Sequence, residues 1–264
     1  MENIKAKKKY GQNFLKDTMV LDRIIQSMPN NNNYVVEIGP GLGDLTKNIV
    51  KYKEMTAYEV DTDLISILES KFAIELEENK LKLIHTDVLE AWDAQGTLHD
   101  GKYDLIANLP YYIATNIILR AFEDKNCESI IVMIQKEVAL KFSAKPKDKE
   151  FSSLGVIADM VSLESRILFD VPPESFDPPP KVMSSILYIR KDMSKTIDKD
   201  FNKFLKACFV QPRKKLSKNL SSLVDKKLIS QYYEELGIND NIRPHEISSS
   251  LYSQLYTKVK NGRN

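Results

Sequence analysis

The chain has 264 residues, and its 38 Lys and Arg against 37 Asp and Glu give a formal net charge of +1 at pH 7. This length accommodates one large domain and one small one. No apolar run approaches the roughly 20 residues of a membrane-spanning helix, and the N-terminus lacks the apolar core of a signal peptide, so we expect a cytoplasmic protein without a membrane partner. Two distant Cys and three His argue against a structural zinc site, and we expect no metal.

The charge is unevenly distributed along the chain. Residues 191–264 contain 15 Lys and Arg and 8 Asp and Glu, a net charge of +7, so residues 1–190, with 23 and 29, carry −6. Lysines also gather near the N-terminus, at Lys7, Lys8 and Lys9. Basic residues at both ends can flank a polyanion, although solvated lysines without a partner explain the counts equally well.

The first 190 residues alternate between strand and helix patterns. Helices are predicted at 44–52 and 64–72, and a proline-rich loop at 172–180 precedes a last strand at 183–190. The alternation is typical of a parallel sheet covered on both faces, hence of an α/β domain over residues 1–190. The remaining strands are predicted from short apolar runs, at 34–38, 55–60, 81–85, 103–107 and 130–134.

After residue 190 the apolar residues recur at helical spacing and no strand alternation is found. This pattern predicts a small all-helical domain over residues 191–264. Two groups of residues carry it, Phe201, Phe204, Leu205, Cys208 and Phe209 in the first and Leu216, Leu220, Leu223 and Val224 in the second.

A glycine-rich turn, Glu37-Ile38-Gly39-Pro40-Gly41-Leu42-Gly43, follows the first predicted strand. Glycines let the backbone turn tightly and approach a ligand, and such a turn in an α/β fold typically binds a nucleotide-like cofactor. The G-x-G-x-G spacing differs from the dinucleotide fingerprint and resembles the S-adenosylmethionine loop of class I (Rossmann-like) methyltransferases. We therefore assign Gly39, Gly41 and Gly43 to a cofactor site, with a plain structural turn as the rival interpretation.

Two carboxylates follow the next two predicted strands. Glu59 ends the second strand, where a carboxylate can accept hydrogen bonds from both ribose hydroxyls of a nucleoside. Asp87 follows the third strand and can accept the adenine amine of the cofactor, although an Asp there is, taken alone, better explained as a helix N-cap. We assign Glu59, Asp87 and the adjacent Val88 to the cofactor site.

The fourth strand ends in Asn108-Leu109-Pro110-Tyr111. This motif resembles the [D/N/S]-P-P-[Y/F] signature of methyltransferases that act on an amine conjugated to a ring. The lone pair of such an amine is delocalised, and two acceptors, the Asn108 side chain and the Leu109 carbonyl, can bind its N–H groups and aim the lone pair at the methyl group. Pro110 stiffens the turn, and Tyr111 offers a face on which a base can stack.

The whole chain resembles the KsgA/RsmA family of small-subunit rRNA adenine dimethyltransferases. Besides the glycine loop, the resemblance rests on Gly11-Gln12-Asn13-Phe14-Leu15, Phe176-Asp177-Pro178-Pro179-Pro180-Lys181-Val182 and Phe209-Val210-Gln211-Pro212-Arg213-Lys214-Lys215-Leu216. It implies that Gln12, Asn13, Leu15 and Asn108 contact S-adenosylmethionine and that Phe176 stacks on the target adenine opposite Tyr111. For RNA binding we assign the basic residues Lys7, Lys8, Lys9, Arg213, Lys214, Lys215 and Lys218.

The chain departs from the family pattern at a few positions. Tyr112-Ile113-Ala114 replaces a usual Asn-Ile-Ser, which puts any polar role at Tyr112 and Ala114 in doubt. Pro212 replaces a usual arginine and removes one expected phosphate contact, and Phe151 begins a segment that replaces a usual Y-G-x-L. The Asn108–Tyr111 motif itself is unaffected.

The resemblance implies dimethylation of N6 on two adjacent adenines near the 3′ end of 16S rRNA, with an immature 30S particle as partner and the chain as a monomer. One alternative is an Erm-type methyltransferase of large-subunit rRNA, which shares the glycine loop and the N-[LI]-P-Y turn. Another is a ribosome-assembly factor that binds RNA without catalysis. A DNA adenine methyltransferase is disfavoured because the chain has no inserted target-recognition domain, and a pyrimidine carbon-5 enzyme because Asn126 and Ala207, not prolines, precede its cysteines.

Overall fold

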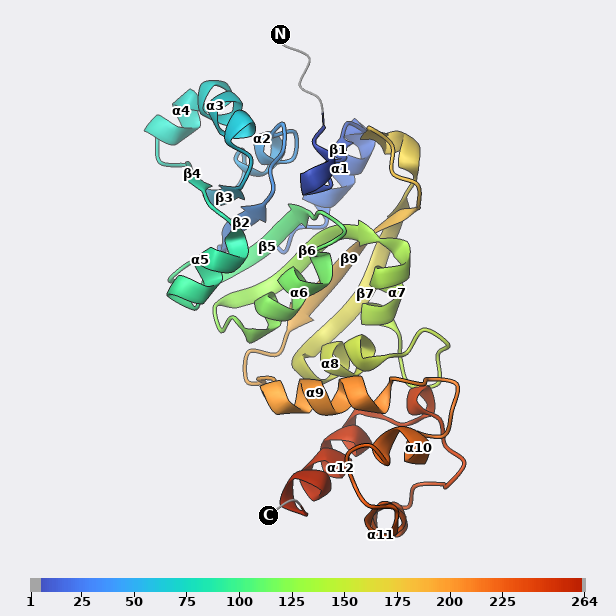
Figure 1. Ribbon diagram of the computed structural model, residues 1–264. Coiled ribbons are helices and arrows are strands. Elements are labelled where there is room, and N and C mark those ends of the chain that lie inside the picture. Colours follow the sequence, from blue (N-terminus) through green and yellow to red (C-terminus); the bar gives the residue numbers. More distant parts are fainter. Residues whose placement is uncertain (1–5, 263–264) are drawn as a thin grey trace. The chain divides into compact units, whose positions relative to one another are not determined.

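A computed structural model describes residues 6–262, except for the side chains of Lys8 and Lys199. The described chain divides into two compact units, one formed by residues up to 139 together with 166–193, and the other by 140–165 together with the residues from 194 on. The sequence predicts one domain boundary, after residue 190. In the structure, residues 140–165 also belong to the unit that contains the C-terminal helices. The two units are described separately (Figure 1).

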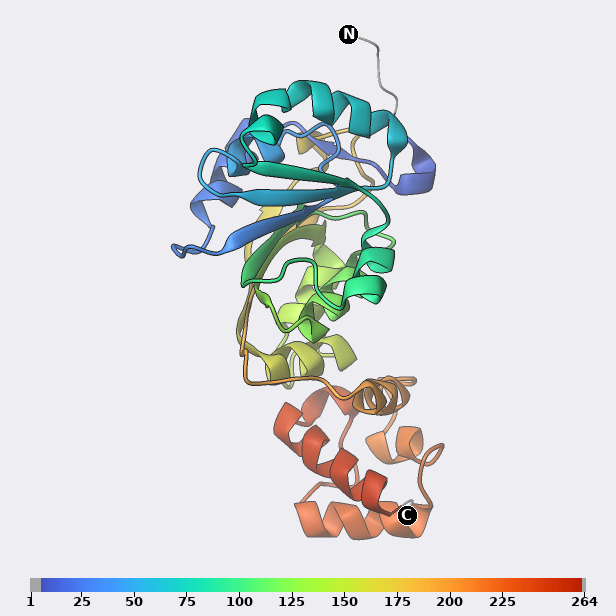
Figure 2. The same cartoon turned by 90° about the vertical axis from the view of Figure 1, so that its left-hand side faces the viewer.

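The first unit is built on a seven-stranded sheet with the order β4-β3-β2-β5-β6-β9-β7. Strands β2 to β6 pair in parallel, and β9 runs antiparallel to β6. The predicted α/β architecture is confirmed, and Figure 2 shows the sheet with its β4 edge toward the viewer. The strands are β2 (Tyr34–Ile38), β3 (Met55–Glu59), β4 (Leu81–His85), β5 (Tyr103–Asn108), β6 (Cys127–Gln135), β7 (Ser162–Val171) and β9 (Ser184–Lys191).

Helices cover both faces of this sheet. On one face, Val35, Met55 and Ile131 belong to an apolar core that also contains Val20 and Leu64 from the helices packed there. On the other face, α6 packs against β6 (Figure 1), burying residues at positions i, i+3, i+4 and i+7 of its sequence. The helices of this unit are α1 (Thr18–Gln26), α2 (Thr46–Ile49), α3 (Thr62–Lys71), α4 (Ala73–Glu77), α5 (Val88–Gln95), α6 (Ala114–Glu123) and the start of α7 (Lys136–Ser143).

A short antiparallel ribbon lies beside the large sheet. It joins β1 (Phe14–Leu15) to β8 (Phe176–Asp177), and it pairs Leu15 with Phe176. The short 3₁₀ helices η1 (Lys8–Tyr10) and η2 (Pro173–Ser175) precede the two strands. Phe14, Leu15 and Phe176 are all buried in the main apolar core, so the ribbon is held against the first unit.

The second unit is helical. Helix α9 buries Phe201, Phe204 and Leu205 on one face, and the ring of Tyr256 packs 5.1 Å from that of Phe201. Helix α12 contacts α8, α9 and α11, so these elements share one small core. The elements of this unit are α8 (Ser153–Val161), α9 (Lys199–Cys208), α10 (Leu216–Leu220), α11 (Lys226–Leu236), η3 (Pro244–Glu246) and α12 (Ser249–Asn261).

Candidate cofactor and substrate site

The glycine loop leaves β2 at the carboxyl edge of the parallel strands. Gly39, Gly41 and Gly43 have φ of +67°, +60° and +76°, a region that residues with a Cβ rarely adopt. Gly39 and Gly41 line a pocket at this edge. Gly43 does not: a Cβ there would lie 2.5 Å from the ring of Phe72, so this glycine permits close packing of the loop on α3.

Glu59, at the end of β3, lines the same pocket beside the glycine loop. Its side chain is only 4% exposed, and burial raises its pKa. The backbone N–H groups of Val60 and Asp61 both donate to Oε1 at 2.9 Å, and that of Gly41 donates to Oε2 at 3.3 Å. The carboxylate is therefore held in place and faces the glycine loop, as a ribose-binding acid requires.

Asp87 and Val88 line the pocket at the end of β4. Asp87 is the N-cap of α5, because its Oδ1 accepts the N–H of Leu89 at 2.8 Å. The side chain is exposed, so its second oxygen is accessible to a ligand. The N-cap and the cofactor contact are compatible roles for this residue.

Asn108 is the last residue of β5, and the motif from Asn108 to Tyr111 lines the pocket next to the glycine loop. The Asn108 amide donates from Nδ2 to the backbone carbonyl of Asn13 at 2.9 Å. A carbonyl only accepts, so this bond fixes the orientation of the amide and leaves Oδ1 as an acceptor for another donor. The hydroxyl of Tyr111 lies 2.6 Å from Oγ of Ser184 in β9, which holds the ring, and burial raises the pKa of this Tyr.

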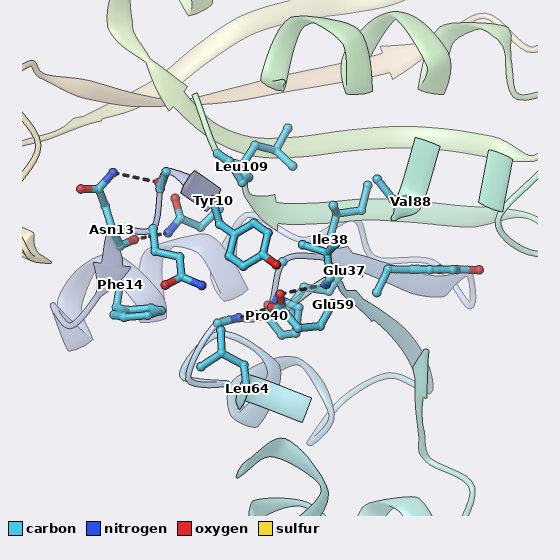
Figure 3. A pocket seen from close by; sticks show the side chains of 18 of the residues that line it. Tyr10, Asn13, Phe14, Glu37, Ile38, Pro40, Glu59, Leu64, Val88 and Leu109 are labelled. Atoms are coloured by element: carbon cyan, nitrogen blue, oxygen red, sulfur yellow. Dashed lines mark hydrogen bonds between the residues drawn. The ribbon is translucent and has the colours of Figure 1, made fainter. Parts of the chain in front are cut away.

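Residues of β1 and of the segment before it complete the pocket. Gln12, Asn13 and Leu15 line it, and so do Tyr10 and Phe14, while their contact with a cofactor stays a prediction. Figure 3 shows Tyr10, Asn13 and Glu59, which come from distant parts of the sequence, gathered around one cavity. Residues 10–15 therefore lie close to the ends of β2, β3 and β5.

Phe176 is not brought to this pocket. Its ring is 4% exposed and belongs to the apolar core, because pairing of β8 with β1 turns it inward. A stacking role for Phe176 on a target base therefore requires the ribbon to shift, and that role stays a prediction. Tyr111, its expected partner, does line the pocket.

The residues assigned to RNA binding differ in their surroundings. Lys7 is engaged by the carboxylates of Asp61 and Asp63, at 2.5 and 2.6 Å. Lys9 is exposed, and the side chain of Lys8 lies outside the described part of the chain. In the second unit all four assigned residues are exposed, namely Arg213, Lys214, Lys215 and Lys218.

Several pocket residues were not expected from the sequence. Tyr10 and Tyr112 both line the pocket, and Tyr112 is 62% exposed at its edge. The aromatic ring of Tyr112 packs over Gly11, where an added Cβ would lie 3.2 Å from Cδ1. The only sequence signal for this contact is that Tyr112 departs from the polar residue usual in the resembling family.

Comparison with known proteins identifies the family. The family model of ribosomal RNA adenine dimethylase matches residues 3–261. The chain is 77% identical, over the full length of both chains, to a protein of Aliarcobacter butzleri named ribosomal RNA small subunit methyltransferase A. This chain belongs to the ribosomal RNA adenine dimethylase family.

Solved structures agree with this family at the level of the fold. A dimethyladenosine transferase from Plasmodium falciparum matches with a TM-score of 0.79 and 22% identity, covering 94% of this chain and 98% of that one. The 23S rRNA methyltransferase ErmE matches with a TM-score of 0.69 and 20% identity, covering 94% and 100%. Both show a class I methyltransferase fold. The dimethylase family therefore shares this fold with ErmE, which is named for 23S rRNA.

The chemistry of the pocket fits S-adenosylmethionine, the cofactor of this dimethylase family. The buried carboxylate of Glu59 accepts from the glycine backbone, and the lining of the cavity combines apolar residues such as Val88 and Ile38 with polar ones such as Asp87. Cys127 and Cys208 are both buried, and burial raises the pKa of Cys127 to about 12, so neither is placed to act as a nucleophile. Within the described residues there is no cluster of His, Cys, Asp and Glu that could hold a metal ion and no helix that could span a membrane.

Proposed function

We propose that this chain transfers methyl groups from S-adenosylmethionine to N6 of two adjacent adenines near the 3′ end of 16S rRNA. The observation that carries the proposal is the orientation of Asn108, whose Nδ2 is bound to the Asn13 carbonyl, so that Oδ1 is left to accept from an amine in the pocket. At this place in the pocket Asn108 presents an acceptor atom. This suits an exocyclic amine, because the N–H groups of the amine are donors.

The residues of the chain position the amine rather than activate it chemically. Asn108 Oδ1 and the Leu109 carbonyl accept its two N–H groups, which favours a pyramidal nitrogen with an available lone pair. Tyr111, held by Ser184, supplies a flat surface for the base. When bound, the cofactor supplies an electrophilic methyl group on a sulfonium sulfur, so no general base is needed to begin the transfer.

The target within the ribosome is proposed from the relatives. The A. butzleri protein is named for the small subunit, and a Sulfurimonas denitrificans relative with the same name is 52% identical over 97% of this chain and 94% of its own length. We propose that the chain acts as a monomer on an immature 30S particle in the cytoplasm, and that the exposed basic residues of the second unit contact rRNA phosphates.

The proposal is tested by mass spectrometry of both rRNAs from cells with and without the gene. Loss of dimethyladenine from small-subunit rRNA alone is the expected result. Loss from large-subunit rRNA instead would point to an Erm-type activity, and no loss from either would indicate an RNA-binding factor without catalysis. Adding back the gene with Asn108→Ala is the matched control, since it should not restore the modification.

A further inference from the structure

The side chain of Lys7 is bound to the first unit by two acids. Its ammonium lies 2.5 Å from Oδ1 of Asp61 and 2.6 Å from Oδ2 of Asp63. The Asp61 side chain is only 3% exposed, and a buried carboxylate is costly unless it is paired. Hydrogen bonding to Asp61 raises the pKa of Lys7, so the ammonium stays charged.

Gln12 also binds Asp61, and it binds the backbone of Lys7 as well. Its Oε1 accepts the backbone N–H of Lys7 at 2.7 Å, and its Nε2 donates to Oδ2 of Asp61 at 2.8 Å. Both oxygens of Asp61 are therefore used to hold residues 7–12. Burial raises the pKa of Asp61, but the bonds from Lys7 and Gln12 outweigh this effect and lower it.

Asp61 also connects this segment to the cofactor site. Its backbone N–H donates to Oε1 of Glu59, the carboxylate assigned to the ribose. One residue beyond Gln12, the carbonyl of Asn13 accepts from the Asn108 amide. A continuous set of bonds thus runs from Lys7 and Asp61, along residues 7–13, to the amide assigned to the substrate amine.

We propose that Lys7 is a positioning residue that holds residues 7–13 against the cofactor site, and not a phosphate ligand. Its charge is compensated by two carboxylates in the folded chain, so a phosphate would have to displace them. Breaking this ion pair removes one of the contacts that hold a segment whose residues Tyr10, Gln12 and Asn13 line the pocket. The inference rests on the proposed function, because it takes the pocket to be a methyl-donor site.

The test measures the dissociation constant for S-adenosylhomocysteine by calorimetry with full-length variants. Lys7→Met should raise this constant about tenfold, the scale of an ion pair that is partly screened. Lys7→Arg, which retains the charge, should stay close to wild type, and Asp63→Asn, which removes one of the two acids, should be intermediate. Lys125→Met, at an exposed position of the first unit, is the neutral control.

RNA binding and kinetics separate this role from its rivals. Lys7→Met should leave the salt dependence of RNA affinity unchanged and raise KM for the cofactor with little change in kcat at saturation. Unchanged cofactor affinity together with a salt slope reduced by about one would instead make Lys7 a phosphate ligand and overturn the proposal. Failure of the proposed function would differ, because the wild-type chain itself would then not bind S-adenosylhomocysteine or methylate RNA.

Discussion

The side-chain amide of Asn108 is held by the backbone carbonyl of Asn13, 2.9 Å from its Nδ2. The two residues are separated by 95 positions in sequence, and each lies in a motif assigned to the site. The bond leaves Oδ1 of Asn108 as an acceptor in the pocket, and it connects the segment that contains Asn13 to the proposed substrate site.

Replacing Asn108 with Ala should strongly lower the rate of methylation and leave RNA affinity nearly unchanged. The variant loses the acceptor for the amine, and loss of one positioned hydrogen-bonding group costs about 100- to 1000-fold in kcat. RNA affinity should remain within about twofold of wild type, because a single side chain supplies a small share of the contacts to an extended RNA. Single-turnover methylation and filter binding on the same RNA measure the two effects, and undiminished turnover would exclude the amine-positioning role.

Asn108→Asp should make cofactor affinity depend on pH. A carboxylate cannot donate to the Asn13 carbonyl and is repelled by it, whereas the protonated acid can donate as the amide does. Affinity for S-adenosylhomocysteine should therefore be close to wild type at low pH and fall as the pH rises through the pKa of the new acid. Calorimetry between pH 5 and 8 measures this. Asn116→Asp, at an exposed position on α6, is the control, and the same pH profile in both variants would contradict the prediction.

Reversing the charge of Arg213, Lys214 and Lys215 to Glu should weaken RNA binding and flatten its dependence on salt. All three side chains are exposed, and every phosphate that the protein no longer neutralises lowers the slope of log K against log salt by about 0.7–0.9. A change of about two or more is expected. Reversal of Lys51, Lys82 and Lys125 in the first unit alters the net charge equally and is the control. If both triple variants gave the same slope, net charge alone would explain the effect.

Gly11→Ala should weaken cofactor binding through a contact with Tyr112. Gly11 has φ of +60°, and an added Cβ would lie 3.2 Å from Cδ1 of the Tyr112 ring. Gly96→Ala is a matched control, since Gly96 has φ of +75° and no atom within 4 Å of its would-be Cβ, so it isolates backbone strain. We expect a several-fold higher dissociation constant for S-adenosylhomocysteine in Gly11→Ala only. The added change Tyr112→Ala should recover part of the loss, and no recovery would mean that strain alone is responsible.

The strands and the motifs of the first unit could be predicted because they depend on local patterns. The runs at 34–38 and 81–85 coincide with β2 and β4, each of which contains three aliphatic residues and is bounded by turns. The helix expected at 44–52 is shorter, Thr46–Ile49, because turns occupy residues 44–45 before it and 50–52 after it. Strand β7 is not predicted, since only two of its ten residues are fully buried and its longest apolar run, Ile167-Leu168-Phe169, has three residues.

The site was predicted only as far as its motifs extend. Asn108, Glu59 and Gly41 are marked by strand ends and glycine spacing, and the structure brings all three to one pocket. The ion pair of Lys7 with Asp61 joins residues 54 positions apart, and no periodicity relates them. Phe176 belongs to a recognisable motif, yet its burial depends on a two-residue ribbon that sequence patterns do not reveal.

Glu37, at the start of the glycine loop, should make stability depend on pH. Its carboxyl is 1% exposed, and burial raises its pKa from 4.5 to about 8, against the opposing hydrogen bond from Thr46 Oγ1 at 2.7 Å. The folded chain therefore binds a proton that the unfolded chain has released, so this residue lowers stability as the pH rises from about 4.5 to about 8, by about 1.4 kcal/mol per pH unit.

Glu37→Gln removes this titration while keeping an oxygen that can accept from Thr46. Its free energy of unfolding, measured by urea denaturation of the ligand-free chain, should fall less than that of wild type between pH 5 and 8, so the difference between the two should widen with pH. Glu69→Gln, at an exposed position on α3, should follow the wild-type profile. A constant difference between Glu37→Gln and wild type across this range would show that Glu37 is ionised in the folded chain, because its carboxylate would then carry the same charge in both states.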